Sequence, residues 1–113
     1  MSTASQRNSL AACIEACRDC HDTCLSMATG HCLFMGGHHA EPEHIRTLLL
    51  CAQTCELAIS AMVMESTLHK EICELCADIC DACATTCSGL EGMEDCYERS
   101  RICKDLCESM AEA

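Results

Sequence analysis

Cysteine and small apolar residues recur along this chain at the spacing of an α-helix. Of the 14 intervals between consecutive cysteines, nine are three or four residues long, and none is one or two. Residues three and four apart lie on the same face of a helix, whereas a strand would require alternation. The pattern therefore predicts an all-α protein in which each helix presents one stripe of cysteines.

Glycine, proline and serine divide the pattern into four predicted helices at about residues 4–29, 42–64, 66–87 and 91–110. We expect Gly30 to end the first helix as a left-handed cap, Pro42 to occupy the first turn of the second, and Ser66 to cap the third. Residues 30–40 are predicted to form a loop. Short connections make neighbouring helices antiparallel, so residues 1–113 are predicted to form a single-domain, up-down-up-down four-helix bundle.

The inward stripes of these helices consist mainly of cysteine. They comprise Cys13, Cys17, Cys20 and Cys24 on the first helix; His44, Leu48, Cys51, Cys55, Ala58 and Met62 on the second; His69, Cys73, Cys76, Cys80, Cys83 and Cys87 on the third; and Met93, Cys96, Ser100, Cys103, Cys107 and Met110 on the fourth. Free cysteine often acts only as a small core residue. Fifteen of them, however, bury less apolar area than leucines would, which favours a chemical role.

Composition and charge exclude several classes of function. There are 18 Asp and Glu against 7 Lys and Arg, and the only aromatic residues are one Phe and one Tyr. Such a surface does not suit nucleic acid. The N-terminal residues resemble no export signal, and no run approaches the roughly 18 apolar residues of a membrane span. We therefore expect a cytoplasmic protein whose odd number of cysteines stays reduced and binds metal.

The cysteine spacing also discriminates between kinds of metal site. Metallothionein-like Cys-x-Cys or Cys-Cys pairs are absent from the sequence, and no cysteine precedes a proline as in bacterial ferredoxin motifs. Cysteines at i and i+4 are close enough to hold one two-coordinate ion without help from another helix. Soft Cu(I) accepts two or three thiolates, whereas Zn²⁺ prefers four, so the pairs favour multiple Cu(I) ions.

Two segments, residues 13–24 (CIEACRDCHDTC) and 73–87 (CELCADICDACATTC), resemble the cytosolic bacterial copper storage proteins. The resemblance extends over essentially the whole chain. It implies a four-helix bundle that holds many Cu(I) ions inside and associates as a homotetramer. Leu48, Ala58 and Ser100 stand at stripe positions where relatives could carry cysteine, which affects the expected capacity.

The predicted ligands combine the thiols with softer donors near the two ends of the bundle. They are Cys13, Cys17, Cys20, Cys24, Cys32, Cys51, Cys55, Cys73, Cys76, Cys80, Cys83, Cys87, Cys96, Cys103 and Cys107, together with His31, His44, His69, Met62, Met93 and Met110. Thioether and imidazole bind Cu(I) more weakly than thiolate and could pass it inward. Alternatively, the methionines only cap the core, and His38 and His39 are solvated loop residues.

Two other functions remain open from the sequence. The protein could be a general buffer for Zn²⁺, Cd²⁺ or Hg²⁺, or a structural bundle without physiological metal. An enzyme is disfavoured, because residues 41–44 (EPEH) supply only half of a di-iron motif and no thiol is singled out as a nucleophile.

The second predicted helix is apolar on more than one face. Leu50, Leu57 and Met64 lie on a face away from the stripe, while Ile45, Leu49, Ile59 and Val63 are expected beside the core. A helix that is apolar most of the way round is buried on more than one side. This predicts that the helix contributes to an oligomer interface.

Overall fold

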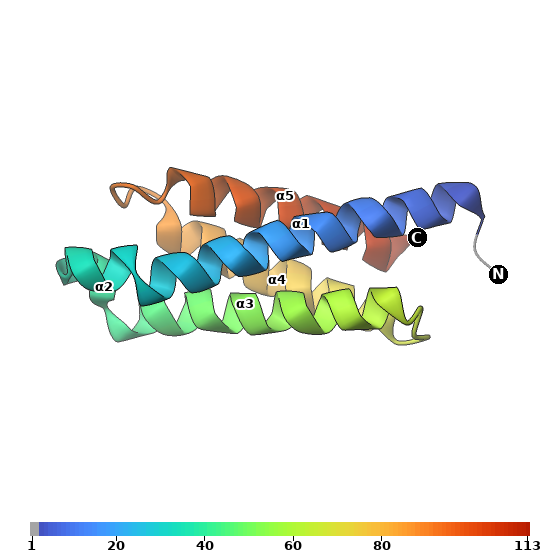
Figure 1. Ribbon diagram of the computed structural model, residues 1–113, viewed down its shortest axis with the longest axis horizontal. Helices are drawn as coiled ribbons and strands as arrows, with labels where there is room; N and C mark the ends of the chain where they lie inside the picture. The colour runs from blue at the N-terminus through green and yellow to red at the C-terminus, as the bar shows by residue number, and fades with distance from the viewer. Residues whose placement is uncertain (1–2) are drawn as a thin grey trace.

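The chain folds into four long antiparallel helices, and a short helical segment connects the first of them to the second (Figure 1). This computed structural model describes residues 3–113. The long helices are α1 (Ala4–Thr29), α3 (Pro42–Val63), α4 (His69–Cys87) and α5 (Glu94–Glu112). The described residues contain no β-strand. The predicted all-α, up-down-up-down bundle is confirmed.

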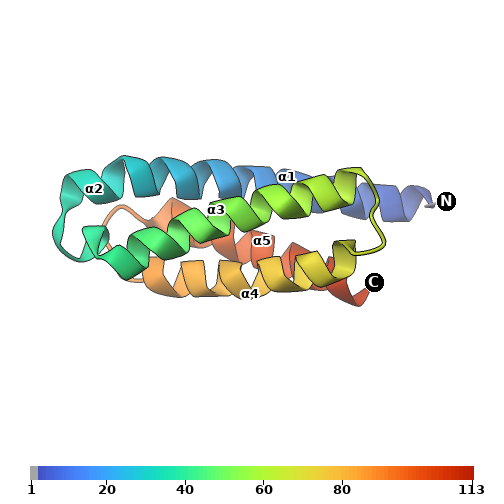
Figure 2. The same cartoon turned by 90° about the horizontal axis from the view of Figure 1, so that it is seen from below.

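The bundle is a slender rod of 49 × 19 × 19 Å. Helix α1 packs against α3 and α5, and α4 packs against the same two helices, so α1 and α4 are diagonal to each other. Figures 1 and 2 place the start of α1, the end of α5 and the α3–α4 connection at one end of the rod. The α4–α5 connection and the segment that joins α1 to α3 lie at the other end.

The segment that joins α1 to α3 is helical, in contrast to the predicted loop. It contains α2 (His31–Met35) and the 3-10 turn η1 (Gly37–Ala40). Gly30 is not a left-handed cap, because its φ is −122° and its N–H still donates to the carbonyl of Ser26. A Cβ at Gly30 would lie 3.0 Å from that carbonyl oxygen, so a larger residue would be tightly packed against the α1 backbone there.

Two of the predicted helix starts are also wrong by three residues. Helix α4 begins at His69, after an N-cap position held by Leu68 that makes no side-chain cap, and α5 begins at Glu94 after Met93. The Ser66 hydroxyl accepts from the N–H of Leu68 instead of capping a helix. Serine therefore stabilises the turn before α4, since its oxygen can satisfy a turn amide as well as a helix amide.

The core is built from the predicted stripes. Every cysteine is buried, and the larger fully buried side chains among the described residues are Leu48, Met62 and Met93. Ile45, Leu49 and Ile59 pack against this core as expected. Val63 does not, because it is 61% exposed at the last residue of α3.

Helix α3 is long and apolar enough to cross a membrane, judged by length and composition alone. An 18-residue window within Pro42–Val63 has a mean hydropathy of 1.3, and 44% of that window is buried inside the bundle. A core helix of a soluble protein passes the same test. The buried stripe and the apolar outer face of α3 together account for its hydropathy.

Candidate metal centre

The fifteen cysteines form one array of reduced thiols along the axis of the bundle. None is in a disulfide. Fourteen have no exposed surface, and Cys87 is 2% exposed. The array is continuous because the long helices space their cysteines three, four or seven residues apart and thus keep the thiols on the inward face.

Sulfur atoms approach one another as closely between helices as within them. The Sγ atoms of Cys20 and Cys24, Cys76 and Cys80, and Cys103 and Cys107 are each 3.9 Å apart. Contacts between helices include Cys24–Cys83 at 3.5 Å and Cys17–Cys103 at 3.6 Å. The nearest partner of a thiol is thus often on another helix, so thiols of two helices, as well as a pair within one helix, lie within reach of a single ion.

Five overlapping groups of thiols are compact enough to hold one ion each, with all Sγ atoms of a group within 4.8 Å of one another. The groups are Cys17–Cys76–Cys103–Cys107, Cys20–Cys55–Cys80–Cys103, Cys13–Cys73–Cys107, Cys20–Cys24–Cys51 and Cys24–Cys83–Cys96. Every group draws on at least two helices. Because several cysteines belong to two groups, neighbouring ions can share a bridging thiolate.

Hydrogen bonds between thiols determine which sulfurs are most easily deprotonated. The pKa of Cys20 is lowered because its sulfur accepts from neighbouring thiols, Cys103 first, and the pKa values of Cys76, Cys83 and Cys107 are lowered for the same reason. Interaction with Cys20 raises the pKa of its neighbour Cys51 to about 11. Loss of a proton is therefore favoured at some thiols of the array over others.

Comparisons with known proteins identify the family. The family model described as copper storage protein matches residues 5–112. The chain belongs to the copper storage protein family. A cysteine-rich protein of Bacillus subtilis (strain 168), YhjQ, described as uncharacterized, is 42% identical over 102 residues, which are 88% of this chain and 94% of that protein.

Solved structures show the same fold. A protein from Nitrosospira multiformis has 43% identity and a TM-score of 0.92, with 94% of this chain and 97% of that one covered. The Cu(I)-bound copper storage protein BsCsp3 has 41% identity and a TM-score of 0.83, with 91% and 98% covered. Copper-free Csp3 from Bacillus subtilis has 40% identity and a TM-score of 0.77, with 88% and 96% covered.

One predicted histidine and one predicted methionine of this copper storage protein meet a cysteine at the end near α2. The Sγ of Cys32 lies 3.4 Å from Nε2 of His44 and 3.6 Å from Sδ of Met93. Burial lowers the pKa of His44, so its neutral form is favoured, and Nδ1 is 3.0 Å from the hydroxyl of Thr86. The Cys32 thiol, the His44 imidazole and the Met93 thioether therefore lie together as three possible metal ligands, and Thr86 orients the imidazole.

The remaining predicted histidines are engaged with the backbone. Nε2 of His31 donates to the carbonyl of Glu91 over 3.1 Å, and Nδ1 of His69 donates to the carbonyl of Ser66 over 2.8 Å. His39, expected to be solvated, is only 8% exposed, and its Nε2 donates to the same Glu91 carbonyl over 2.8 Å. His31 and His39 thus hold the α4–α5 connection in place. Met62 and Met110 are buried in the core as expected.

Sequence reasoning missed the partners that hold these groups. Thr86 is 42 residues away from His44, and no periodicity connects them. Ser100 lies on the predicted stripe of α5, and periodicity assigns it no partner. Its hydroxyl is fully buried and donates to Sγ of Cys83 over 3.3 Å. Its position on the cysteine stripe was the one available signal.

Proposed function

We propose that this protein stores Cu(I) in the cytoplasm and binds many ions per chain through thiolates inside the bundle. The observation that carries this proposal is the continuous, buried array of fifteen reduced thiols. Membership of the copper storage protein family supports it, as does the similarity to Cu(I)-bound BsCsp3. The proposed role is sequestration rather than catalysis, and residues 1–113 act as one storage unit.

The spacing of the sulfurs suits low-coordinate copper. Two thiolates bound to one ion at ~2.3 Å lie ~4 Å apart when the site is trigonal. The Sγ contacts of 3.5 Å for Cys24–Cys83 and 3.9 Å for Cys55–Cys103 are close to that value before any metal is bound. Copper can therefore enter with small side-chain movements, while the burial of the array limits oxidation and loss of the ion to competing thiols.

A buffer for Zn²⁺ or Cd²⁺ is the second candidate, and the two four-thiol groups favour it. Cys17–Cys76–Cys103–Cys107 and Cys20–Cys55–Cys80–Cys103 each offer the four sulfurs that a tetrahedral ion prefers. However, the two groups share Cys103, and the other groups contain three thiols. An array of shared and three-membered groups suits Cu(I), which accepts two or three bridging thiolates.

We propose that the ligands are the fifteen cysteines, with Cys32, His44 and Met93 as a mixed site at the α2 end. The contact of Cys32 with both His44 and Met93 supports this site. His31, His69, Met62 and Met110 are the other candidates. One ring nitrogen of His31 and of His69 donates to a carbonyl, which leaves the second nitrogen of each imidazole available to a metal ion.

An anaerobic titration of the reduced protein with Cu(I) against a competing chelator tests storage. We expect a plateau near or above about one tightly held ion per thiol. Saturation at about one or two ions would contradict storage and would indicate a chaperone, a sensor or a zinc-type site. Competition by Zn²⁺ and Cd²⁺ in the same experiment separates the two candidate functions.

We further propose a homotetramer that uses the outer face of α3. Leu50 is 51% exposed and Leu57 is 50% exposed, with Met64 one further heptad along. We expect Leu57→Glu to dissociate the assembly, whereas Leu75→Glu, on α4 and 49% exposed, leaves it intact. Sedimentation velocity measures both. A wild-type protein that sediments as a 12.3 kDa monomer at micromolar concentration would contradict this proposal.

A further inference from the structure

Ser100 is the position at which the α5 side of the thiol array is interrupted. Its side chain is fully buried, and it occupies the stripe between Cys96 and Cys103. Its oxygen lies 3.3 Å from Sγ of Cys83, 3.8 Å from Sγ of Cys20 and 4.0 Å from Sγ of Cys24. At this level of the bundle α1, α3 and α4 present thiols, whereas α5 presents a hydroxyl.

An alcohol oxygen cannot replace a thiolate for Cu(I), because the ion is soft and neutral oxygen is a hard, weak ligand. Ser100 can only donate its proton to Cys83 and accept from Cys20 or Cys24. A Cu(I) ion that moves along the bundle past Ser100 therefore finds no thiolate ligand on α5 at this position.

The sulfur contacts on the two sides of Ser100 form two sets. Toward the α4–α5 connection, Cys24 contacts Cys83 and Cys96, and Cys96 contacts Cys87, at 3.5 to 3.8 Å. Cys32 adjoins this set through Met93, whose Sδ lies 3.6 Å from the Cys32 sulfur and which precedes Cys96 by three residues at the start of α5. We define the small pool as Cys24, Cys32, Cys83, Cys87 and Cys96.

The other ten thiols form the large pool, which meets the small pool at Cys20 and Cys51. The large pool comprises Cys13, Cys17, Cys20, Cys51, Cys55, Cys73, Cys76, Cys80, Cys103 and Cys107. The two pools meet in the Cys20–Cys24–Cys51 group, with Sγ distances of 3.9 Å for Cys20–Cys24 and 3.7 Å for Cys20–Cys51.

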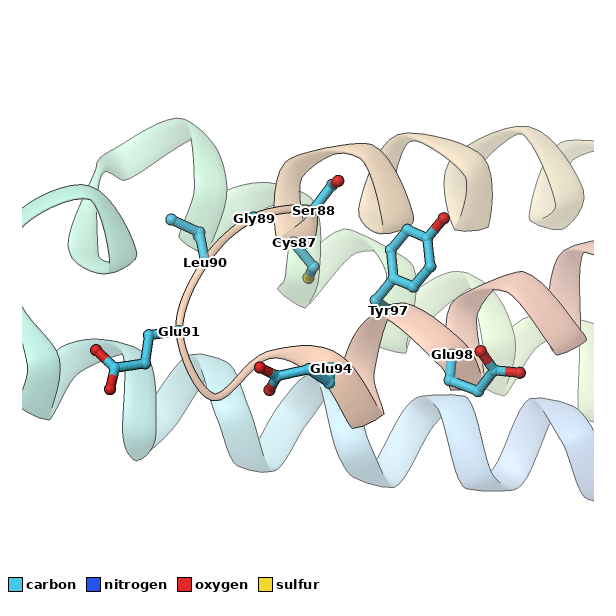
Figure 3. A pocket seen from close by; sticks show the side chains of 8 residues that line it. All are labelled: Cys87, Ser88, Gly89, Leu90, Glu91, Glu94, Tyr97 and Glu98. Carbon is cyan, nitrogen blue, oxygen red and sulfur yellow. The ribbon is translucent and has the colours of Figure 1, made fainter.

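The small pool reaches the surface through a pocket of about 500 Å³ beside the α4–α5 connection. Figure 3 shows the Cys87 side chain directed into the space that this connection encloses, with Glu94 and Tyr97 on the adjoining turn of α5. Gly89 adds no side chain to the rim, and nothing lies within 4 Å of its Cβ position. The carboxylates of Glu91, Glu94 and Glu98 give the pocket negative charge, which favours a cation.

Among the described residues, the pockets at the opposite end of the bundle are lined by no cysteine. A pocket of about 380 Å³ there is lined by His69 and Met110 and contains no cysteine in its wall. Met110, which is 7% exposed, stands at this end of the core. Of the two pockets, only the one at Cys87 opens directly onto a thiol that contacts a further thiol, at 3.6 Å from Cys96.

We propose that Ser100 divides the stored copper into two pools, a small pool that exchanges rapidly through the pocket at Cys87 and a large pool that exchanges through the small one. This inference rests on the proposed storage of Cu(I). In this proposal Ser100 slows the movement of copper between the two pools, and Cys87 is the thiol that exchanges copper with ligands at the surface.

Release of copper from the fully loaded protein to excess bicinchoninate, followed anaerobically by absorbance, tests the two pools. Wild-type protein is expected to release about one third of its copper in a fast phase, because five of the fifteen thiols belong to the small pool. Ser100→Cys supplies a thiol on α5 at this position. It is expected to increase the number of bound ions and to accelerate the slow phase several-fold. Ser100→Ala, the matched control, adds no thiol and keeps both phases.

A single release phase in the wild-type protein would overturn the division into pools. So would a slow phase that Ser100→Cys leaves unchanged although it binds additional copper, or one that Ser100→Ala accelerates equally. Each of these results leaves storage intact, because the number of bound ions is measured separately. Saturation at about one or two ions would instead contradict storage itself.

A pair of substitutions on α4 tests the surface thiol. Cys87→Ser and Cys73→Ser each remove one buried thiol, from opposite ends of the same helix. Both are expected to lower capacity by a similar amount, but only Cys87→Ser is expected to slow the fast phase several-fold. A slower fast phase in Cys73→Ser, with Cys87→Ser unaffected, would place the exchange at the other end and overturn the inference.

Discussion

Leu48 is one of the few large side chains in a core otherwise built from cysteine, alanine and methionine. It is fully buried on the α3 stripe one turn from Cys51 and four residues from His44. Each cysteine contributes less apolar area than a leucine, so the stability of the copper-free protein depends strongly on the few larger residues.

We expect Leu48→Ala to lower the free energy of unfolding of the reduced, copper-free protein by about 3 kcal/mol, because it leaves a cavity between packed helices. Leu75→Ala makes the same chemical change on a side chain that is 49% exposed. Its expected effect is about 0.5 kcal/mol. Urea denaturation followed by circular dichroism measures both, and equal losses would show that the core does not rely on Leu48.

Protonation of individual thiols sets the pH dependence of copper binding. The pKa of Cys51 is raised to about 11, chiefly by its interaction with Cys20, and burial raises that of Cys32. These thiols carry protons at neutral pH, and Cu(I) must displace them. Lower pH therefore opposes binding.

We expect the apparent affinity for Cu(I) to fall about tenfold per pH unit for each proton that an ion displaces, as pH is lowered from 8 to 6. Competition with a chelator of known pH dependence measures the affinity, and a pH-stat measures the released protons. Affinity that stays constant over this range would mean that the thiols which bind first are already ionised.

At the scale of elements, the ends of the helices depended on contacts that the sequence pattern does not encode. Residues 66–68 and 91–93 form turns rather than helix, and α2 forms where a loop was expected. The α4–α5 connection is shaped by Gly89 and Gly92, whose φ values are +79° and +80°. The imidazoles of His31 and His39 fix it through the Glu91 carbonyl.

Substitution of the two glycines separates backbone strain from packing. Both Gly89→Ala and Gly92→Ala force a side chain into a left-handed conformation, at a cost of about 1 kcal/mol each. A Cβ at Gly92 would also lie 2.7 Å from the His31 ring, whereas that at Gly89 meets nothing within 4 Å. We expect Gly92→Ala to be the more destabilising in thermal unfolding and to increase hydrogen exchange in residues 88–93. Equal effects would argue against the His31 contact.

The whole molecule is a rod whose interior is a ligand-binding surface as well as a core. The compact thiol groups draw on α1, α3, α4 and α5, so copper bound in one group joins helices that are distant in the sequence. A ligand that binds only the folded state stabilises it according to its affinity and free concentration.

We expect copper loading to raise the unfolding free energy progressively, by about 4 kcal/mol for one site at a free Cu(I) concentration ~1000 times its dissociation constant. Thermal unfolding at increasing Cu(I) equivalents measures the rise, with Ag(I) as a soft-metal comparison. A midpoint that does not move would mean that the unfolded chain binds copper as well as the bundle does.

Taken alone, the sequence determined the helical class, the inward stripes and the identity of the thiols, because the intervals of three and four residues repeat from Cys13 to Cys107 and helix geometry converts them directly into a face. Only the tertiary structure decided which thiols adjoin. Cys24 meets Cys83 and Cys96, Cys32 meets His44 and Met93, and Ser100 meets Cys83. Contacts between helices depend on the rotation and axial register of each helix, which periodicity within one helix does not specify.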